Sequence, residues 1–193
     1  MKKVWMYIVL STVLFTGCIA DKRNLQFVES LVETELSNDA LQLRYRAPKG
    51  FHLVDQHYTD SIANVQLLQD GFSPVVLSIH VDTLKGASMM LSDIRYLPED
   101  KLEKEIKNYK KTYNQHNTWN KVNRMTYSHH NFDIVEINCE NDTYMLTKLF
   151  FYEDKHPTFV VDYFIPIVEK ETYTPLINSS IASFEKGYTL IFH

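Results

Sequence analysis

The chain has 193 residues, of which 45% are hydrophobic and 13% aromatic, enough to bury the core of one compact domain. Its 20 Lys and Arg residues stand against 24 Asp and Glu residues, which gives a net charge of −4 at pH 7. Because nucleic acids are bound by clustered basic side chains, this acidic balance argues against a nucleic-acid partner.

The first eighteen residues have the layout of a secretory signal. Lys2 and Lys3 form a basic start, an apolar run covers Val4 to Phe15, and small residues precede Cys18. The apolar run is too short to cross a bilayer core of about 30 Å, so a spanning helix is not expected.

A cysteine directly after these small residues resembles the lipobox of bacterial lipoproteins, in which the cysteine carries lipid such as palmitate and becomes the first mature residue. The resemblance implies a signal peptide over residues 1–17 and lipidation of Cys18. It also implies a location in the bacterial cell envelope, where the lipid anchors the protein to a membrane and the domain faces the periplasm or the exterior. The alternative is an ordinary signal peptide with a cysteine there by chance.

Removal of residues 1–17 would leave 18 basic and 24 acidic side chains, a net charge of −6. Cys139 then has no partner for an internal disulfide, because the other cysteine, Cys18, carries the lipid. Cys139 follows Val135 and Ile137 at a spacing of two, which predicts that the three share one strand face. With acidic residues beside it and no cation, Cys139 is predicted to be buried and unreactive.

Residues 18–39 are predicted to hold the lipidated cysteine, a short tether and one helix. Ile19 to Arg23 lacks the Gly, Ser and Pro of a long flexible stalk. Apolar residues then recur at helical spacing, which predicts a helix from about Leu25 to Leu36. Its polar face carries glutamates where a membrane-surface helix would carry Lys and Arg, so the helix is expected to pack on the domain.

The following part of the chain is predicted to form strands and turns. Alternating apolar and polar residues predict a half-buried strand over 41–45, and Pro48-Lys49-Gly50 predicts a turn. Further strands are predicted over 51–54, 63–68 and 75–81, and a loop over Gly86–Arg95.

One long helix is predicted after Pro98, which is tolerated as the first residue of a helix. Leu102, Ile106, Tyr109 and Tyr113 are spaced by four, three and four residues and form one apolar stripe. The lysines of this segment are interleaved with acidic residues, which indicates a solvated face more than a binding patch.

Two hairpins rich in aromatic and β-branched residues follow. Their strands are predicted over 122–127, 132–139, 144–152 and 158–165. Both faces of the last two strands are apolar, so they are predicted to lie centrally in the sheet. If Tyr152 pairs with Thr158, Lys148 lies opposite Asp162, and the two charges offset each other inside apolar strands.

Thr174 before Pro175 resembles an N-cap, which predicts a last helix that starts there and ends at Gly187, followed by a strand or packed tail over 188–192. Strands that follow one another without alternating helices predict an α+β fold. We expect a mainly antiparallel β-sheet packed with two principal helices, in one domain over residues 40–193.

Two short motifs resemble PsbP-like domains. Tyr45-Arg46-Ala47-Pro48-Lys49-Gly50-Phe51 is similar to the opening strand and turn of that family, and Ile177-Asn178-Ser179-Ser180-Ile181-Ala182-Ser183-Phe184 is similar to its C-terminal helix. The resemblance covers residues 40 to 192 and implies a secreted or lipid-anchored protein that binds or scaffolds without catalysis. It carries over no catalytic residue, because the matched positions are turn and core positions.

No catalytic residue and no cofactor is predicted from motifs. The sequence contains no G-x-x-x-x-G-K-[ST], G-x-G-x-x-G, G-x-S-x-G, H-E-x-x-H or C-x-x-C. Asp133 with Glu136, or Asp162 with Glu136, are conceivable acid pairs, although spacing alone does not bring either pair into a pocket.

The histidines carry a weak signal of chemistry in the sequence. His129, His130 and Asp133 are the first place to look for a metal site, although adjacent histidines in a turn usually point to different sides. We therefore expect a surface turn and no metal. His80, in an apolar strand, is expected to be a hydrogen-bonded residue of the sheet.

Tyrosine is frequent, at 12 residues, and its ring offers a large contact with a polar end. Tyr109, Tyr113, Tyr127 and Tyr144 could line a groove for a partner, or they could cover the core. We expect a membrane-anchored envelope lipoprotein with a non-catalytic binding or scaffolding domain and an envelope protein as its partner. The alternatives are an envelope hydrolase or metal-dependent enzyme of unrecognised type, and a structural subunit of an envelope assembly.

Overall fold

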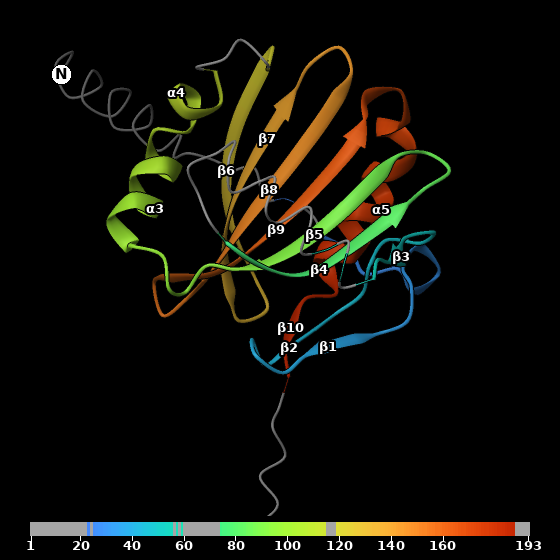
Figure 1. Ribbon diagram of the computed structural model, residues 1–193, viewed down its shortest axis with the longest axis horizontal. Helices are drawn as coiled ribbons and strands as arrows, with labels where there is room; N and C mark the ends of the chain where they lie inside the picture. The colour runs from blue at the N-terminus through green and yellow to red at the C-terminus, as the bar shows by residue number, and fades with distance from the viewer. Residues whose placement is uncertain are drawn as a thin grey trace, which may run out of the picture.

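The computed structural model describes Arg23, residues 25–55, His57, Thr59, and residues 74–114 and 119–187. In this part of the chain the fold is α+β, with ten strands in two antiparallel sheets and three α-helices (Figure 1). The two principal helices, Glu99–Lys107 and Lys170–Ala182, have 9 and 13 residues. The predicted fold class, a mainly antiparallel sheet with two principal helices, is confirmed.

The larger sheet has seven strands in the order β3-β4-β5-β9-β8-β7-β6. Along the chain they are β3 (His52–Leu53), β4 (Val75–Asp82), β5 (Ala87–Asp93), β6 (Lys121–His129), β7 (Phe132–Glu140), β8 (Tyr144–Glu153) and β9 (His156–Pro166). The smaller sheet consists of β1 (Leu36–Asn38), β2 (Leu43–Tyr45) and β10 (Glu185–Lys186). The α-helices are α3 (Glu99–Lys107), α4 (Tyr109–Asn114) and α5 (Lys170–Ala182).

Strands β8 and β9 lie in the middle of the larger sheet, as their two apolar faces predict. Lys148 pairs with Asp162 across these strands, and its Nζ lies 3.4 Å from the Oδ1 of Asp162. The predicted placement of the two charges is confirmed. The assumed pairing of Tyr152 with Thr158 is wrong by one residue, because a bulge shifts Tyr152 onto Pro157.

Each face of the larger sheet has its own core, because successive residues of a strand point to opposite faces. The face covered by α5 and the smaller sheet, here called the α5 face, buries large aromatic side chains, among them Phe132, Phe151, Phe159, Tyr163 and Tyr173. The face covered by α3 and α4, the α3 face, buries a second cluster that includes Val135, Ile137, Cys139, Phe150 and Val160. Figure 1 shows the helices on opposite sides of the sheet.

Cys139 is buried on the α3 face together with Val135 and Ile137, as the spacing of two predicts. Burial raises the pKa of its thiol to about 12. Since the thiolate is the reactive form of cysteine, a thiol with this pKa stays protonated and inert near neutral pH.

The long helix predicted in the middle of the chain is divided into two. The α-helical geometry ends at Asn108, and α4 continues directly after it. Leu102 and Ile106 of α3 are buried, and Tyr109 and Tyr113 of α4 pack against the same cluster. The apolar stripe is therefore continuous across the break, although the helix is not.

The helix predicted over Leu25–Leu36 is wrong. The structure has only a short 3₁₀ helix, η2 (Glu29–Leu31), and β1 begins at Leu36. The backbone of Val28 bonds instead to Ser179 of α5, whose Oγ accepts from the Val28 N–H at 2.8 Å and donates to the Val28 C=O at 2.9 Å. These tertiary hydrogen bonds take the backbone groups that a helix would pair internally.

The loop predicted over Gly86–Arg95 is also wrong, because most of it forms β5. The residues of β5, Ala87–Asp93, include none of the β-branched residues that mark a strand. Even so, β5 pairs with β4 on one side and β9 on the other, and its side chains alternate between the two faces. The strand predicted over 63–68 and the tail predicted over 188–192 lie outside the described residues.

The last helix begins earlier and ends earlier than predicted. It runs from Lys170 to Ala182, so Pro175 lies inside α5, and the Oγ1 of Thr174 donates to the C=O of Lys170 at 2.7 Å instead of capping the helix. A preceding 3₁₀ helix, η3 (Ile167–Glu169), leads directly into α5. Pro175 is exposed, which fits the backbone carbonyl that it leaves without an intrahelical partner.

Candidate functional site

The structure does not bring together His129, His130 and Asp133, the first place to look for a metal site. The rings of His129 and His130 lie 4.1 Å apart between centroids, and the Nε2 atoms lie 3.1 and 3.4 Å from the C=O of Ala182. Burial lowers the pKa of His129. Asp133 is engaged separately, because its Oδ1 accepts from the Ser128 Oγ at 2.5 Å. Among the described residues, no group of three or more His, Cys, Asp and Glu could hold a metal ion.

The four tyrosines proposed as a partner surface do not share one groove. Tyr109 and Tyr113 pack on the core of the α3 face, whereas Tyr127 packs on the core of the α5 face. Tyr144 is 37% exposed and stacks on Phe164, with 4.5 Å between ring centroids. Three of the four therefore cover the cores, and the sheet separates the pair on α4 from Tyr127.

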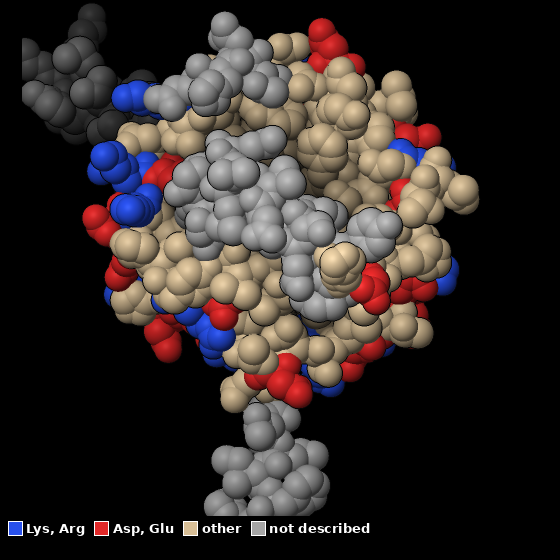
Figure 2. Space-filling model, in the orientation of Figure 1, with Lys and Arg blue, Asp and Glu red and all other residues tan. Residues whose placement is uncertain are grey.

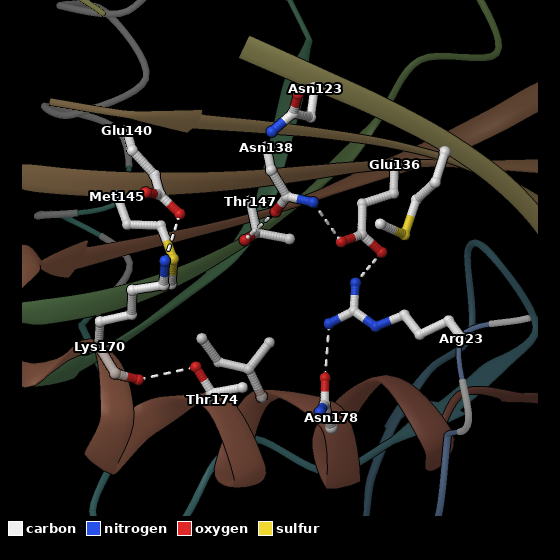
Figure 3. A pocket seen from close by; sticks show the side chains of 12 residues that line it. Arg23, Asn123, Glu136, Asn138, Glu140, Met145, Thr147, Lys170, Thr174 and Asn178 are labelled. Carbon is white, nitrogen blue, oxygen red and sulfur yellow. Dashed lines mark hydrogen bonds and ion pairs between the residues drawn. The ribbon is translucent and has the colours of Figure 1, made fainter. Parts of the chain in front are cut away.

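A pocket of about 510 Å³ lies on the α5 face, between α5 and strands β6, β7 and β8 (Figure 3). Cavities that hold small molecules commonly measure about 300–1,000 Å³. The lining residues come from the three strands, from the helix and from the segment that precedes β1. They are Arg23, Asn123, Met125, Glu136, Asn138, Glu140, Met145, Thr147, Lys170, Thr174, Ile177 and Asn178.

At one end of the pocket Glu136 is a buried carboxylate. It lies on β7 and is 1% exposed, on the same face as the fully buried Ile134. Tyr127 donates its hydroxyl to Oε2 at 2.7 Å, and the Nδ2 of Asn138 donates to Oε1 at 2.6 Å. The conceivable acid pairs with Asp133 and Asp162 do not form on this face, because both lie at the alternate positions of their strands.

Arg23 supplies the positive charge opposite this carboxylate. Its guanidinium forms an ion pair with Glu136 through Nη1, and its Nη2 donates to the Oδ1 of Asn178 at 2.5 Å. It also lies over the ring of Tyr127, 6.0 Å from the centroid. The side chain is 17% exposed. Burial lowers the pKa of Arg23. Burial raises the pKa of Tyr127 to about 12, so its hydroxyl keeps its proton near neutral pH.

The other end of the pocket holds a second ion pair. The Nζ of Lys170 donates to the Oε1 of Glu140 at 2.5 Å, and Lys121 lies 3.6 Å from the other oxygen. The hydrogen bond from Lys170 lowers the pKa of Glu140. Because Lys170 begins α5 and Glu140 ends β7, this pair joins the helix to the sheet.

Amides and hydroxyls occupy the floor and rim between the two ion pairs. Figure 3 shows Asn138 and Thr147 between them on the strands, and Thr174 and Asn178 rising from α5. The Oγ1 of Thr147 donates to the Oδ1 of Asn138 at 2.7 Å. With the apolar side chains of Met125 and Ile177 beside them, these groups can bind a small ligand through hydrogen bonds and apolar contact.

Only a faint signal of this pocket is present in the sequence. Glu136, Asn138 and Glu140 alternate with apolar residues on β7, so the three polar side chains share one face of the strand. A row of polar residues on one face of a strongly predicted strand can indicate a buried polar site instead of a face exposed to solvent. The roles of Arg23 and Asn178 have no such signal. Both are joined to the pocket by contacts between segments far apart in the chain.

His80 lies in a separate buried cluster. The hydroxyl of Tyr45 shares a hydrogen bond of 2.9 Å with the Ser78 Oγ and lies 3.3 Å from the His80 Nε2. Burial lowers the pKa of His80 to about 4, so the ring is neutral near pH 7. The expectation of a hydrogen-bonded sheet histidine is confirmed. The Tyr45 hydroxyl lies between Ser78 and His80 and bonds to both. Ser78 and His80 are therefore not arranged as a serine nucleophile in direct contact with a histidine base.

No protein-family model and no curated protein matches the chain. No helix within the described residues is both long enough and apolar enough to cross a membrane. On the face drawn in Figure 2, acidic and basic side chains are mixed around the outline.

Proposed function

We propose that this protein is a lipoprotein of the bacterial cell envelope, anchored to a membrane through a lipid on Cys18, whose single PsbP-like domain acts by binding and not by catalysis. The signal-like segment over 1–17 and the position of Cys18 support the anchor. The pocket between α5 and strands β6–β8 supports the binding role and is the proposed ligand site.

One observation carries the non-catalytic binding role. The four charged side chains among the described lining residues form two ion pairs, Arg23 with Glu136 and Lys170 with Glu140. A general acid or base needs a titratable group free to exchange its proton with a substrate. Here each carboxylate is held by an opposite charge, and the remaining polar groups are amides and hydroxyls suited to recognition.

The anchor is tested with the full chain expressed in a bacterial host supplied with an alkyne-tagged fatty acid. We expect the wild-type protein to incorporate the tag and to partition into detergent and membrane fractions. Cys18→Ser should abolish both, whereas the matched control Cys139→Ser should leave both unchanged, because Cys139 is buried. Tag incorporation by Cys18→Ser would contradict the proposed anchor.

The binding role is tested by crosslinking the acylated protein in membranes and comparing its partners with those of Cys18→Ser. Thr174→Trp places a bulky ring at the pocket rim, while Thr172→Trp places the same ring on an exposed position of α5 outside the lining. We expect Thr174→Trp to lose crosslinked species that Thr172→Trp retains. Identical patterns for the two variants would show that the pocket is not the binding site.

A further inference from the structure

We propose that the pocket is a binding site for a guanidinium group, and that Arg23 occupies this site from within the same chain until a ligand bearing a guanidinium displaces it. This inference rests on the proposed binding role of the pocket and names the chemical class of its ligand. It also makes Arg23, which lies five residues after Cys18, an internal competitor for the site.

The domain provides a contact for each terminal nitrogen of Arg23 and one for the face of its guanidinium. The carboxylate of Glu136 faces one terminal nitrogen, the amide oxygen of Asn178 accepts from the other, and the ring of Tyr127 lies beneath the cation. Tyr127 and Asn138 hold the two oxygens of Glu136 from the side of the protein. Glu136 is therefore held by residues of β6 and β7 and does not depend on Arg23 for its place, while α5 presents Asn178.

The counter-charge for Glu136 comes from outside the two sheets. Arg23 precedes β1, and its guanidinium contacts are with Glu136, Asn178 and Tyr127. A carboxylate that is 1% exposed is costly to leave without a cation. If Arg23 leaves, the site therefore favours another cation over remaining empty.

The geometry selects a guanidinium over an ammonium. Two different nitrogens of Arg23 reach two acceptors, Glu136 and Asn178, which lie on different elements. A planar guanidinium presents its donors as a fork and stacks on an aromatic ring, whereas an ammonium is a compact, strongly hydrated point charge. An ammonium in this place would satisfy Glu136 but would match the fork and the Tyr127 ring poorly.

The space beside Arg23 accommodates the rest of a ligand. The pocket extends from Glu136 to the ion pair of Lys170 with Glu140, and amides and apolar side chains line the part between (Figure 3). An internal group on a short segment competes at an effective concentration on the order of millimolar. A ligand must therefore add contacts in this free part of the pocket, as an arginine derivative or an arginine within a peptide segment can.

The test uses the acylated full chain in detergent and three matched probes: butylguanidinium, butylammonium and the neutral isostere butylurea. Binding is followed by calorimetry and by the shift in melting temperature at constant ionic strength. We expect Arg23→Ala to bind butylguanidinium about tenfold or more tightly than the wild-type protein does, because the internal competitor is gone. The same variant should melt below the wild type and recover with butylguanidinium, but not with butylurea.

Two further variants keep the test decisive. Glu136→Gln in the Arg23→Ala background should remove the preference for butylguanidinium over butylurea. Arg23→Lys keeps a positive charge for the fold, so it carries the test if Arg23→Ala does not fold, and it should bind butylguanidinium with intermediate affinity. Equal affinity of wild type and Arg23 variants, or no preference for butylguanidinium over butylurea, would overturn the proposal.

A further comparison distinguishes a small-molecule ligand from an arginine within a polypeptide. Free arginine and an acetylated Gly-Arg-Gly amide are each measured against the analogue in which citrulline replaces arginine. Tighter binding of the peptide supports an arginine in a polypeptide, and tighter binding of the amino acid supports a small-molecule ligand. A failure of these measurements leaves acylation of Cys18 and the Thr174→Trp crosslinking pattern unaffected. A failure of the guanidinium assignment can therefore be distinguished from a failure of the proposed function.

Discussion

His80 and Glu136 are two polar side chains that the α5 face buries to the same degree, each 1% exposed. Their environments differ. His80 is held neutral among Tyr45 and apolar neighbours, whereas Glu136 is paired with the guanidinium of Arg23. Burial of a charge is costly without a partner, so His80 is buried as a neutral ring and Glu136 as half of an ion pair.

The burial of His80 predicts a specific pH dependence of stability. Its pKa is lowered from 6.5 to about 4 in the folded protein, so between these values the unfolded chain binds a proton that the folded chain does not. The free energy of unfolding should be fully retained above about pH 6.5 and fall as the pH approaches 4, by up to about 3 kcal/mol. Urea unfolding at a series of pH values between 6.5 and 4 measures this change in the free energy of unfolding.

The control for this prediction is His80→Gln, which keeps a hydrogen-bonding side chain but cannot titrate. Its free energy of unfolding should decline less steeply between pH 6.5 and 4 than that of the wild-type protein. Parallel declines would assign the pH dependence to other groups.

At the scale of elements, α5 connects the pocket to the N-terminal segment. Asn178 binds Arg23, and the adjacent Ser179 binds both backbone groups of Val28. Successive residues of one helix therefore hold the side chain and the main chain of the same segment. Movement of Arg23 out of the pocket need not release Val28, because Ser179 holds Val28 independently.

Removal of the Ser179 hydroxyl should loosen the N-terminal segment without dissolving the fold. Ser179→Ala leaves the N–H of Val28 without its partner, whereas the C=O of Val28 keeps the bond from the Leu31 N–H, at a cost of about 1–2 kcal/mol. Hydrogen exchange at the Val28 amide should become markedly faster. The matched control is Ser180→Ala, which removes hydrogen bonds to Tyr163 and Arg46 and should leave exchange at Val28 unchanged. Equal protection of Val28 in the wild type and Ser179→Ala would contradict this role.

At the scale of the whole molecule, Arg23 determines where the proposed anchor can lie. Four residues lie between Cys18 and Arg23, and the five Cα–Cα steps that join the two span at most about 18 Å. While Arg23 occupies the pocket, the proposed lipid attachment at Cys18 would therefore lie within that distance of the Arg23 backbone. The α5 face is expected to lie toward the membrane and the α3 face away from it.

A fluorophore on each face checks this orientation in vesicles that contain lipid-attached quenchers. Thr174→Cys places the label at the pocket rim, and Lys101→Cys places it on an exposed position of α3 on the other side of the sheet. We expect stronger quenching at position 174 than at position 101, and the difference should shrink for Arg23→Ala. Equal quenching at both positions would rule out the orientation. Buried Cys139 should not take the label.

Regular local patterns account for the parts of the fold that could be predicted from the sequence. Alternation of apolar residues located β6 to β9, and the placement of Lys148 opposite Asp162 followed from it, because a two-residue repeat decides which face each side chain takes. The same repeat placed Cys139 on a buried face. Over residues 25–36 the helical spacing of apolar residues gave a wrong prediction. This segment does not form the predicted helix, and the backbone of Val28 bonds to Ser179 of α5 instead.

The sequence by itself determined the α+β class, the central strand pair and the signal-like segment before Cys18, since these depend on residues close together in the chain. Only the tertiary structure decided the pocket. Arg23, Glu136 and Asn178 come from three separate segments, and nothing in the spacing within each segment says that they meet. Packing of α5 on the sheet brings them together, and the cost of burying the Glu136 charge requires that a cation meet it there.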